Sequence, residues 1–161
     1  KLNLRKYSIS IKKFLKNHNS KIIFEPGRSI IGNAAILLSK ITYIKKGFKK
    51  DFVILDTAMN DFIRPALYKS VHRIIPIIIN KKKSKRIYEF VGPICESTDK
   101  FLTLKNYQKL KENDFLGICD VGAYGMSLSS NYNLRTKPIE ILIKGSETIV
   151  INKRQKLKDL I

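Results

Sequence analysis

The stretch KIIFEPGRSIIGNA, residues 21–34, decides how the chain divides. Its apolar run at 22–24 ends in Glu-Pro-Gly at 25–27, which is typical of a short buried strand that meets a turn. Residues 6–17, just before it, place apolar side chains at helical spacing with lysines opposite. A helix that leads into a buried strand with polar residues at its end is the repeating unit of an α/β barrel, where chemistry collects at the strand ends.

The chain changes character after this unit, and short β-type runs separated by turn or charge clusters follow. Two further segments, 60–70 and 123–133, have helical patterns, and the lysine cluster 81–85 is interpreted as an exposed hairpin loop. Several short strands at fairly regular spacing predict a β-barrel or sandwich. The β-type runs are residues 35–46, 51–58, 72–80, 85–92, 114–122, 137–145 and 147–152.

We therefore predict a mostly-β fold with some α-helix, divided into two parts. Residues 1–32 are expected to form the last helix and strand of an incomplete α/β (TIM-type) barrel. Residues 33–161 are expected to form a C-terminal β domain with short helices. One helix-strand unit cannot close a barrel, and the chain begins at Lys1, so we expect it to be the C-terminal portion of a longer protein, a split-gene product or the product of a decaying gene.

Composition and cysteine content argue against a membrane protein, a metal-binding protein and an exported, disulfide-bonded protein. Hydrophobic residues make up 43% of the chain, and no apolar run approaches the roughly 18–20 residues of a membrane helix. The longest, at 74–79, contains a proline. The two cysteines and two histidines lack metal-site spacing, so we expect no metal. Without a disulfide framework or an export signal, the simplest expectation is a reduced, cytoplasmic protein with no membrane contact.

The formal net charge of +19 suggests nucleic acid as a partner. Three features argue against it: the lysines are spread along the chain, with the densest cluster at 81–83; arginine, the better reader of phosphates and bases, is much rarer; and the Ile, Lys and Asn content is what an AT-rich genome would impose at tolerant surface sites. We expect no functional nucleic-acid partner and keep a non-catalytic, basic nucleic-acid-binding module as an alternative.

Five short stretches combine Gly or Pro turns with reactive side chains. Each alone has an ordinary interpretation: a surface ion pair at a strand end, a helix-capping Arg64, a packed Tyr124 or a buried, inert Cys95. The five are EPGR at 25–28, MNDFIRPALY at 59–68, GPICES at 92–97, DVGAYG at 120–125, and SSNYN at 129–133 with Arg135 after it.

In this order and at these distances, the five stretches resemble the diaminopimelate decarboxylase family of fold-type III pyridoxal-phosphate enzymes. The resemblance runs through FEPGRSIIGNA, LDTAMNDFIRPALY, VGPICESTD, DVGAYGMSLSSNYNLR and KPIEIL to the end of the chain. It implies the C-terminal portion of a decarboxylase that converts meso-2,6-diaminopimelate to L-lysine and CO2 with pyridoxal 5'-phosphate. It also implies a homodimer with shared active sites. A related decarboxylase of ornithine or arginine remains the alternative within the fold.

The resemblance also implies roles for individual residues. The Glu25 carboxylate would keep the cofactor's ring nitrogen protonated, so that the ring accepts electrons as the C–CO2 bond breaks. Gly27 would let backbone approach the cofactor, and arginine forks would bind a substrate carboxylate. The implied cofactor residues are Glu25, Pro26, Gly27, Arg28 and Tyr124; the implied substrate residues are Arg28, Arg64, Tyr68, Glu96 and Tyr124.

Cys95 and Glu96 carry the chemistry at the substrate's two ends. Cys95 would be the catalytic proton donor after CO2 departs, and Glu96 would bind the distal polar end. The family pair reaches into the other subunit's site, and Cys-Glu favours diaminopimelate where ornithine-type enzymes carry Cys-Asp. Thr98 departs from the family's glycine at that position, which could shift the backbone after Glu96.

Two family motifs are not found in the chain. The Schiff-base lysine of the family lies on an early barrel strand, and its Gly-rich phosphate loop precedes the helix at 6–17. No lysine here sits in a matching motif. We therefore expect this chain to be inactive alone and to need an upstream barrel half as a partner.

Overall fold

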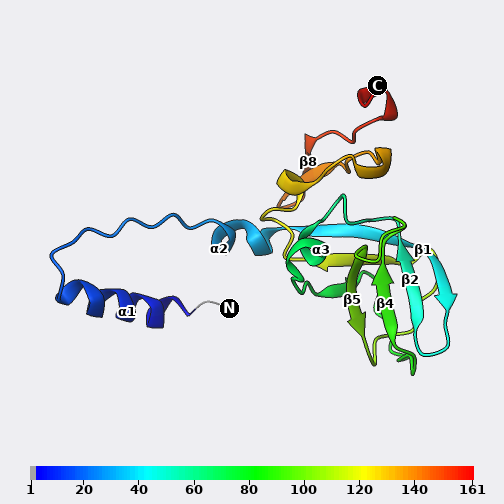
Figure 1. Cartoon of the computed structure of the whole chain (residues 1–161), viewed down its shortest axis with the longest axis horizontal. Coiled ribbons are helices and arrows are strands. Elements are labelled where there is room, and N and C mark those ends of the chain that lie inside the picture. Colours follow the sequence, from blue (N-terminus) through cyan, green and yellow to red (C-terminus); the bar gives the residue numbers. More distant parts are fainter. Residues whose placement is uncertain (1–2) are drawn as a thin grey trace.

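The computed structural model describes residues 3–161, which form a helical arm, a mostly-β body and a separate hairpin (Figure 1). The helices are α1 Leu4–Lys16, α2 Arg28–Ile31 and α3 Arg64–Tyr68. The strands are β1 Ile36–Lys46, β2 Asp51–Leu55, β3 Ile74–Pro76, β4 Tyr88–Val91, β5 Lys100–Leu104, β6 Phe115–Cys119, β7 Glu140–Lys144 and β8 Glu147–Asn152. Short 3-10 turns are η1 Gly32–Ala34, η2 Met126–Leu128, η3 Tyr132–Leu134 and η4 Leu157–Asp159.

Helix α1 confirms the helix predicted at 6–17. It begins where the Asn3 side chain accepts a hydrogen bond from the Lys6 N–H at 3.0 Å, and it ends with Lys13 and Lys16 in its last turn. No residue of α1 is buried. On its apolar face, the Tyr7 ring packs edge to face against Phe24 of the following segment, with ring centroids 6.0 Å apart.

The buried strand predicted at 22–24 is wrong in this structure. Residues 18–27 are extended, but they form no ladder with any part of the described chain. Ile23 is 77% exposed and Phe24 is 50% exposed. Side-chain pattern alone does not make a strand, because its backbone N–H and C=O groups need a neighbouring strand as partner. The segment instead links α1 to the body as an isolated arm (Figure 1).

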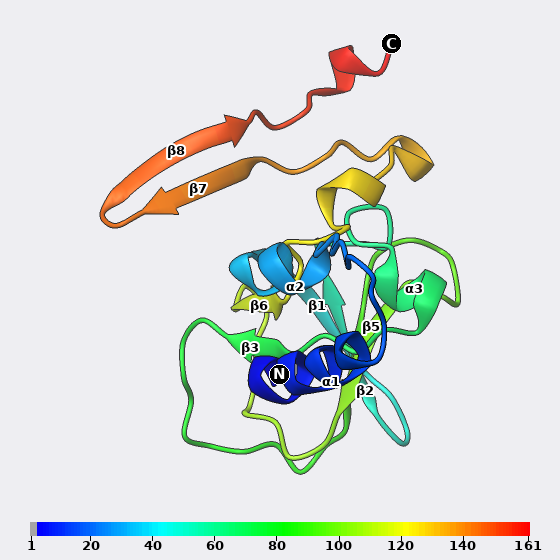
Figure 2. The same cartoon turned by 90° about the vertical axis from the view of Figure 1, so that its left-hand side faces the viewer.

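Six strands form one sheet in the order β3-β6-β1-β2-β4-β5, antiparallel except between β2 and β4. The long strand β1 joins its two halves: Ile36–Lys40 pairs with β6, and Ile41–Lys46 pairs with β2, with a register shift between Ile41 and Tyr43. Its outer strands, β3 and β5, are not paired with each other. The mostly-β class is confirmed, but the body is an open, half-barrel sheet in the described residues, where we predicted a closed barrel or sandwich (Figure 2).

A single core holds this sheet together. Strand β2 buries alternate residues, as a half-buried strand should. Val53, Phe90 and Ile118, from three strands, are fully buried, and Phe62 from the loop after β2 covers them. Each such side chain contributes about 1.5–3 kcal/mol through removal of apolar surface from water.

Three local predictions need correction. Strand β5 follows the CESTD segment directly, and its short KFLTL pattern was not recognised. The loop at 81–85 is no hairpin, since β3 pairs with β6 while β4 pairs with β2 and β5. The helix predicted at 123–133 is only the two turns η2 and η3, because Tyr124 adopts φ 60° and Ser129 is extended with ψ 149°, both outside the helical region.

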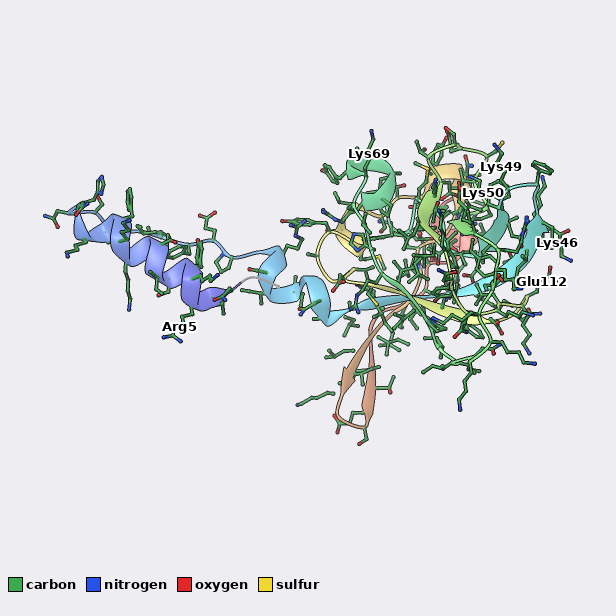
Figure 3. All side chains as sticks on the ribbon, turned by 90° about the horizontal axis from the view of Figure 1, so that it is seen from below. Arg5, Lys46, Lys49, Lys50, Lys69 and Glu112 are labelled. Atoms are coloured by element: carbon green, nitrogen blue, oxygen red, sulfur yellow. The ribbon has the colours of Figure 1, made fainter. Side chains whose placement is uncertain are left out.

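The topology sorts the connecting loops onto two ends of the sheet. The site end carries residues 56–73, 92–99 and 120–135. The lysine end carries residues 47–50, 77–87 and 105–114. In Figure 3, Lys46, Lys49, Lys50 and Glu112 gather at the lysine end, and the arm with Arg5 extends from the opposite side of the body.

Candidate active site

The structure brings four of the predicted site residues together at the site end. The guanidinium carbon of Arg64 lies 5.2 Å from the ring centre of Tyr68 and 5.4 Å from that of Tyr124. The Tyr124 hydroxyl lies 3.6 Å from the position that a Cβ on Gly27 would occupy. Three of the five predicted stretches, separated along the chain, therefore meet at one place.

Arg64 is a buried cation without an anionic partner. It begins helix α3, where Pro65 fits the first turn because the missing N–H needs no intrahelical acceptor. Arg64 is 9% exposed, and its Nε atom has no hydrogen-bond partner. Among the described residues no carboxylate lies within 4.0 Å of it. A buried charge is costly unless paired, so this position suits a carboxylate or phosphate from a bound molecule.

Tyr124 is held in an uncommon backbone conformation, with φ 60°. Such a conformation costs of order 1–3 kcal/mol for a bulky residue and persists only where its surroundings fix it. Here the Gly122 N–H donates to the Gly32 carbonyl at 3.0 Å. A Cβ on Gly122 would overlap the Ile31 carbonyl oxygen, so only glycine allows this approach. The close contact between the 120–125 loop and α2 places Tyr124 beside Gly27.

A hollow of about 700 Å³ opens beside this cluster and is lined by Pro26, Arg28 and Arg64, among others. Glu25 is exposed in the extended segment before Gly27. His72 also lines the hollow, but both its ring nitrogens are satisfied: Nδ1 lies 3.0 Å from the Cys119 carbonyl and Nε2 lies 3.1 Å from the Ser70 hydroxyl. His72 is therefore a packed core residue, as its edge-to-face contact with Phe62 indicates.

Asp99 fixes the loop that carries Cys95 and Glu96. Its carboxylate is 2% exposed and accepts hydrogen bonds from the Met59 N–H at 2.7 Å and the Ile94 N–H at 2.8 Å. Burial raises the pKa of Asp99, although these two bonds oppose the shift. Thr98 has no positive φ, so the backbone accommodates this departure from the family's glycine.

Cys95 and Glu96 themselves lie exposed on this loop. The Glu96 Oε1 atom accepts a hydrogen bond from the Tyr132 hydroxyl at 2.6 Å. In the described part of the chain, no hydrogen bond or ion pair joins either residue to the group formed by Gly27, Arg64, Tyr68 and Tyr124. The next residues of the same loop, Ser97 and Thr98, line a small hollow together with Pro65 and Ala66 of α3.

A polar cluster connects two of the stretches singled out in the sequence, 59–68 and 129–135, through contacts that were not predicted. Arg135 donates from Nε to Asn60 Oδ1 at 2.8 Å, and its Nη2 atom lies 3.6 Å from Asp61 Oδ2. The Asn60 carbonyl accepts from the Ser130 N–H at 2.9 Å. Burial raises the pKa of Asp61, opposed by the Ala58 N–H and by Arg135. All of these residues belong to the recognised stretches, but nothing in the sequence indicated that Arg135 would bond to Asn60.

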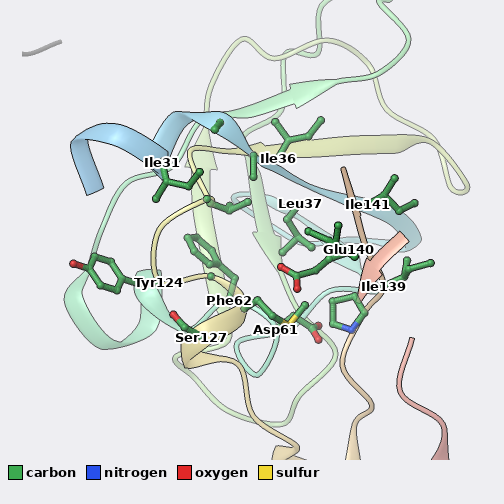
Figure 4. Close-up of a pocket in the computed structure, with 18 of the residues that line it drawn as sticks. Ile31, Ile36, Leu37, Asp61, Phe62, Tyr124, Ser127, Ile139, Glu140 and Ile141 are labelled. Atoms are coloured by element: carbon green, nitrogen blue, oxygen red, sulfur yellow. The ribbon is translucent and has the colours of Figure 1, made fainter. Parts of the chain in front are cut away.

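A second, mostly apolar hollow of about 510 Å³ lies between the body and strand β7. Figure 4 shows Ile31, Leu37, Phe62 and Ile141 among its walls, with Tyr124 at its edge. Strand β7 pairs only with β8, and most side chains of this hairpin are exposed.

The residues present fit pyridoxal phosphate on two observations. The unpartnered Nε of Arg64 offers a buried cation, and Gly27 presents bare backbone toward the Tyr124 hydroxyl. For metals, residues 3–161 contain no group of three or more His, Cys, Asp or Glu side chains that could hold an ion. No helix in the same range is long and apolar enough to cross a membrane.

Comparison with known proteins agrees with this geometry. Residues 7–122 match the family described as pyridoxal-dependent decarboxylase, C-terminal sheet domain. The chain is 42% identical over 155 residues to the diaminopimelate decarboxylase of Haemophilus influenzae, covering 96% of this chain and 37% of that protein. The solved structure of diaminopimelate decarboxylase from Helicobacter pylori with L-lysine matches with a TM-score of 0.86 and 40% identity, over 99% of this chain and 39% of the other.

A more distant solved structure is similar to this chain in fold alone. The structure of a lysine/ornithine decarboxylase from Vibrio vulnificus matches with a TM-score of 0.73 at 17% identity, covering 84% of this chain and 38% of the other. The chain thus spans a little over a third of the length of these relatives.

Proposed function

Because the chain belongs to the pyridoxal-dependent decarboxylases, as the C-terminal sheet domain of that family, we propose that it forms the C-terminal part of a diaminopimelate decarboxylase. The intact enzyme would release CO2 from meso-2,6-diaminopimelate and leave L-lysine. The observation that carries the proposal is Arg64, a buried, unpartnered arginine between two aromatic rings, next to Gly27. The relatives at about 40% identity that bear this name support the choice of substrate.

The cofactor would be held by Glu25, Pro26, Gly27, Arg28 and Tyr124. When bound, pyridoxal phosphate supplies a ring that accepts the electron pair of the broken C–CO2 bond. Glu25 would hold a proton at the ring nitrogen, and Tyr124 is fixed by its loop at the edge of the same space. Gly27 would allow the cofactor close to the backbone.

The substrate would be oriented by Arg28, Arg64 and Tyr68. A carboxylate bound by the Arg64 fork would satisfy the free Nε atom and pair the buried charge. The Tyr68 and Tyr124 rings flank the guanidinium and restrict its direction. This arrangement fixes the substrate before the reaction, which is where arginine clamps contribute to rate.

The exposed Cys95 would deliver a proton to the carbon that loses CO2, and Glu96 would bind the distal, charged end of the substrate. Their exposure on this loop, without a hydrogen bond or ion pair to the Arg64 group in the described residues, is consistent with action in the active site of a second subunit. We therefore propose a homodimer with shared sites.

The proposal also includes an upstream barrel portion as a partner. The relatives are far longer than this chain, and α1 has an apolar face with no buried residue, as expected of a helix that packs on further structure. The motif lysine that attaches the cofactor and the phosphate-binding loop would belong to that portion. The chain alone is then expected to be inactive, and the assembled enzyme to be cytoplasmic.

The test uses the intact enzyme and a panel of substrates. We expect CO2 release from meso-diaminopimelate and little from ornithine or arginine. Cys95→Ala should slow turnover by at least about a hundredfold, because general acid catalysis contributes factors of this size, while cofactor absorbance stays nearly unchanged. Cys119→Ala removes the buried cysteine and serves as the matched control. Fast turnover of ornithine or arginine, with diaminopimelate ignored, would contradict the substrate.

One observation favours a second candidate function, binding of a nucleic acid. Eleven of the 25 lysines lie at or next to the lysine end of the sheet, and ten of these eleven make no ion pair in the described residues. Phe48, 95% exposed, projects from the same end, and aromatic side chains among lysines suit single-stranded nucleic acid. The lysines without an ion pair in the described residues are Lys45, Lys46, Lys49, Lys81, Lys82, Lys83, Lys85, Lys105, Lys109 and Lys111.

This candidate is tested by the salt dependence of binding to single-stranded DNA. Steep salt dependence that persists in Arg64→Lys but is lost when Lys81, Lys82, Lys83 and Lys85 become glutamine would support it. Absence of binding at low salt would remove it and leave the decarboxylase proposal unaffected.

A further inference from the structure

Tyr132 and Glu96 form a hydrogen bond between two loops of the site end. The Tyr132 hydroxyl donates to Glu96 Oε1 at 2.6 Å, a short distance typical of bonds to an ionised acceptor. The residues are 36 positions apart, so only the fold brings them together. In the described residues this is the one hydrogen bond that the Glu96 side chain makes, which leaves Oε2 free.

The backbone turn that carries Tyr132 is fixed by hydrogen bonds of a neighbouring side chain. It begins turn η3, whose next two residues, Asn133 and Leu134, have φ 56° and 53°. The Asn131 side chain closes this turn by donating to the Arg135 carbonyl at 2.8 Å and to Gln155 Oε1 at 2.6 Å. Side chains on rigid support are those that can orient a neighbour.

The support continues into the body of the protein. Arg135 donates to Asn60 Oδ1 at 2.8 Å and to the Asp56 carbonyl at 2.5 Å. The Cys95–Glu96 loop is tied to the same region separately, through Asp99 and the Met59 N–H. Tyr132 and Glu96 thus belong to two loops that are anchored on one segment, 56–60, after β2.

We infer that Tyr132 is a positioning residue that holds the Glu96 carboxylate in the orientation in which its free oxygen binds the cationic distal end of the substrate. This inference rests on the proposed function. A phenol suits the task, because it orients the carboxylate without neutralising it, whereas a cationic partner would compete with the substrate's ammonium group. Without the phenol, the exposed Glu96 side chain would sample several rotamers, and binding would bear the entropy of fixing it.

The chemistry of the pair is consistent with this role. The hydrogen bond to Glu96, together with its charge, raises the pKa of the Tyr132 hydroxyl. The Tyr132 hydroxyl therefore remains protonated, and a donor, to a higher pH than an ordinary tyrosine.

The first arm of the test needs no activity and uses this chain. Tyrosinate absorbance is titrated in the wild type, Tyr132→Phe and Glu96→Gln. The wild-type minus Tyr132→Phe difference should show a hydroxyl that ionises later than an ordinary tyrosine, and Glu96→Gln should move this transition to lower pH. If the Tyr132 hydroxyl ionised at the pH of an ordinary tyrosine, and Glu96→Gln left that pH unchanged, the inference would be overturned. Tyr43→Phe, with a similarly exposed tyrosine on β1, is the control.

The second arm uses the intact enzyme and meso-diaminopimelate. Tyr132→Phe should raise KM about tenfold or more, as expected for a hydrogen bond to a charged group, and leave kcat nearly unchanged. Glu96→Gln should raise KM further, and adding Tyr132→Phe to it should have little extra effect, because the two act as one unit. A structural role would instead lower kcat or the free energy of unfolding.

The outcomes separate the inference from the function on which it rests. A decarboxylase with unchanged KM in Tyr132→Phe overturns the inference and leaves the function standing. A wild-type enzyme without decarboxylase activity overturns the function and the inference with it, and the first arm then still reports whether the hydrogen bond exists.

Discussion

The two ends of the six-stranded sheet hold their loops in different ways. At the site end, buried polar side chains fix the backbone: Asp99 accepts two N–H bonds, and Arg135 connects Asn60 with Asp61. At the lysine end, the buried carboxylates of Asp51 and Glu89 are held by ion pairs instead, Asp51 with Arg86 and Glu89 with Lys50 and Lys100. Most other charged side chains there extend into solvent. The same sheet therefore carries one set of loops with a specified geometry and one set that tolerates change.

This difference indicates where function depends on structure. Buried polar groups and uncommon backbone conformations are costly and persist where position is important. Tyr124 and the Asp99 loop have these features, and they carry the predicted site residues. Exposed lysines contribute little to stability, so the residue types at these positions can follow the base composition of the genome.

The largest expected effect comes from removing the Asp99 carboxylate. Asp99→Ala should lower the free energy of unfolding by about 2–4 kcal/mol, because two N–H groups lose their acceptor, one of them buried. Asp114→Ala removes an acceptor of the Lys111 N–H at the lysine end and should cost about 0.5 kcal/mol or less. Urea unfolding measures both. Equal losses of stability in the two variants would show that the two ends do not differ in how their loops are fixed.

The next effect tests the contact between the 120–125 loop and α2. Gly122→Ala should cost about 1–3 kcal/mol, because the added methyl overlaps the Ile31 carbonyl. Hydrogen exchange should quicken at the amide of residue 122, which donates to Gly32. Unchanged exchange in Gly122→Ala would contradict the close approach.

A smaller effect is expected in how the free energy of unfolding depends on pH, because carboxylates at the two ends have pKa values shifted in opposite directions. Burial opposes ionisation of Glu89, but hydrogen bonds and charge from Lys50 and Lys100 outweigh it, so its pKa is lowered. Its stabilisation is complete above its ordinary pKa and is lost as pH falls through the lowered value. The pKa of Asp61 is raised, so its contribution instead falls as pH rises from its ordinary value through the raised one.

Urea midpoints between about pH 3 and 6 test both signs. Glu89→Gln should make the loss of stability on acidification shallower than in the wild type. Asp61→Asn should make it steeper, since ionisable Asp61 opposes that loss. Identical pH profiles in the two variants would show that the shifts do not differ between the two ends.

The smallest effect concerns the lysines themselves. Replacing Lys81, Lys82, Lys83 and Lys85 by glutamine should change the free energy of unfolding by no more than about 0.5 kcal/mol, because surface changes away from buried features are nearly neutral. A loss above 2 kcal/mol would mean that this loop is structural.

The sequence predicted helix α1, most strands and the polar stretches of the site, because periodicity and turn residues are local properties. It failed where partners decide the outcome. Residues 22–24 have a strand pattern but no neighbour to pair with, and β5 was too short to separate from the loop before it. The convergence of Gly27, Arg64 and Tyr124 followed from family resemblance, whereas the link from Arg135 to Asn60 depends on contacts that no single motif reveals.

The most direct test of the account compares both ends in one activity measurement. CO2 release from meso-diaminopimelate is measured for the intact enzyme, for Arg64→Lys and for the fourfold lysine-to-glutamine variant. We predict that Arg64→Lys lowers kcat/KM by about a hundredfold or more, because lysine lacks the planar fork that orients a carboxylate, and that the fourfold variant stays within about twofold, because exposed charges far from a site act weakly. Equal losses, or a fully active Arg64→Lys, would contradict the account.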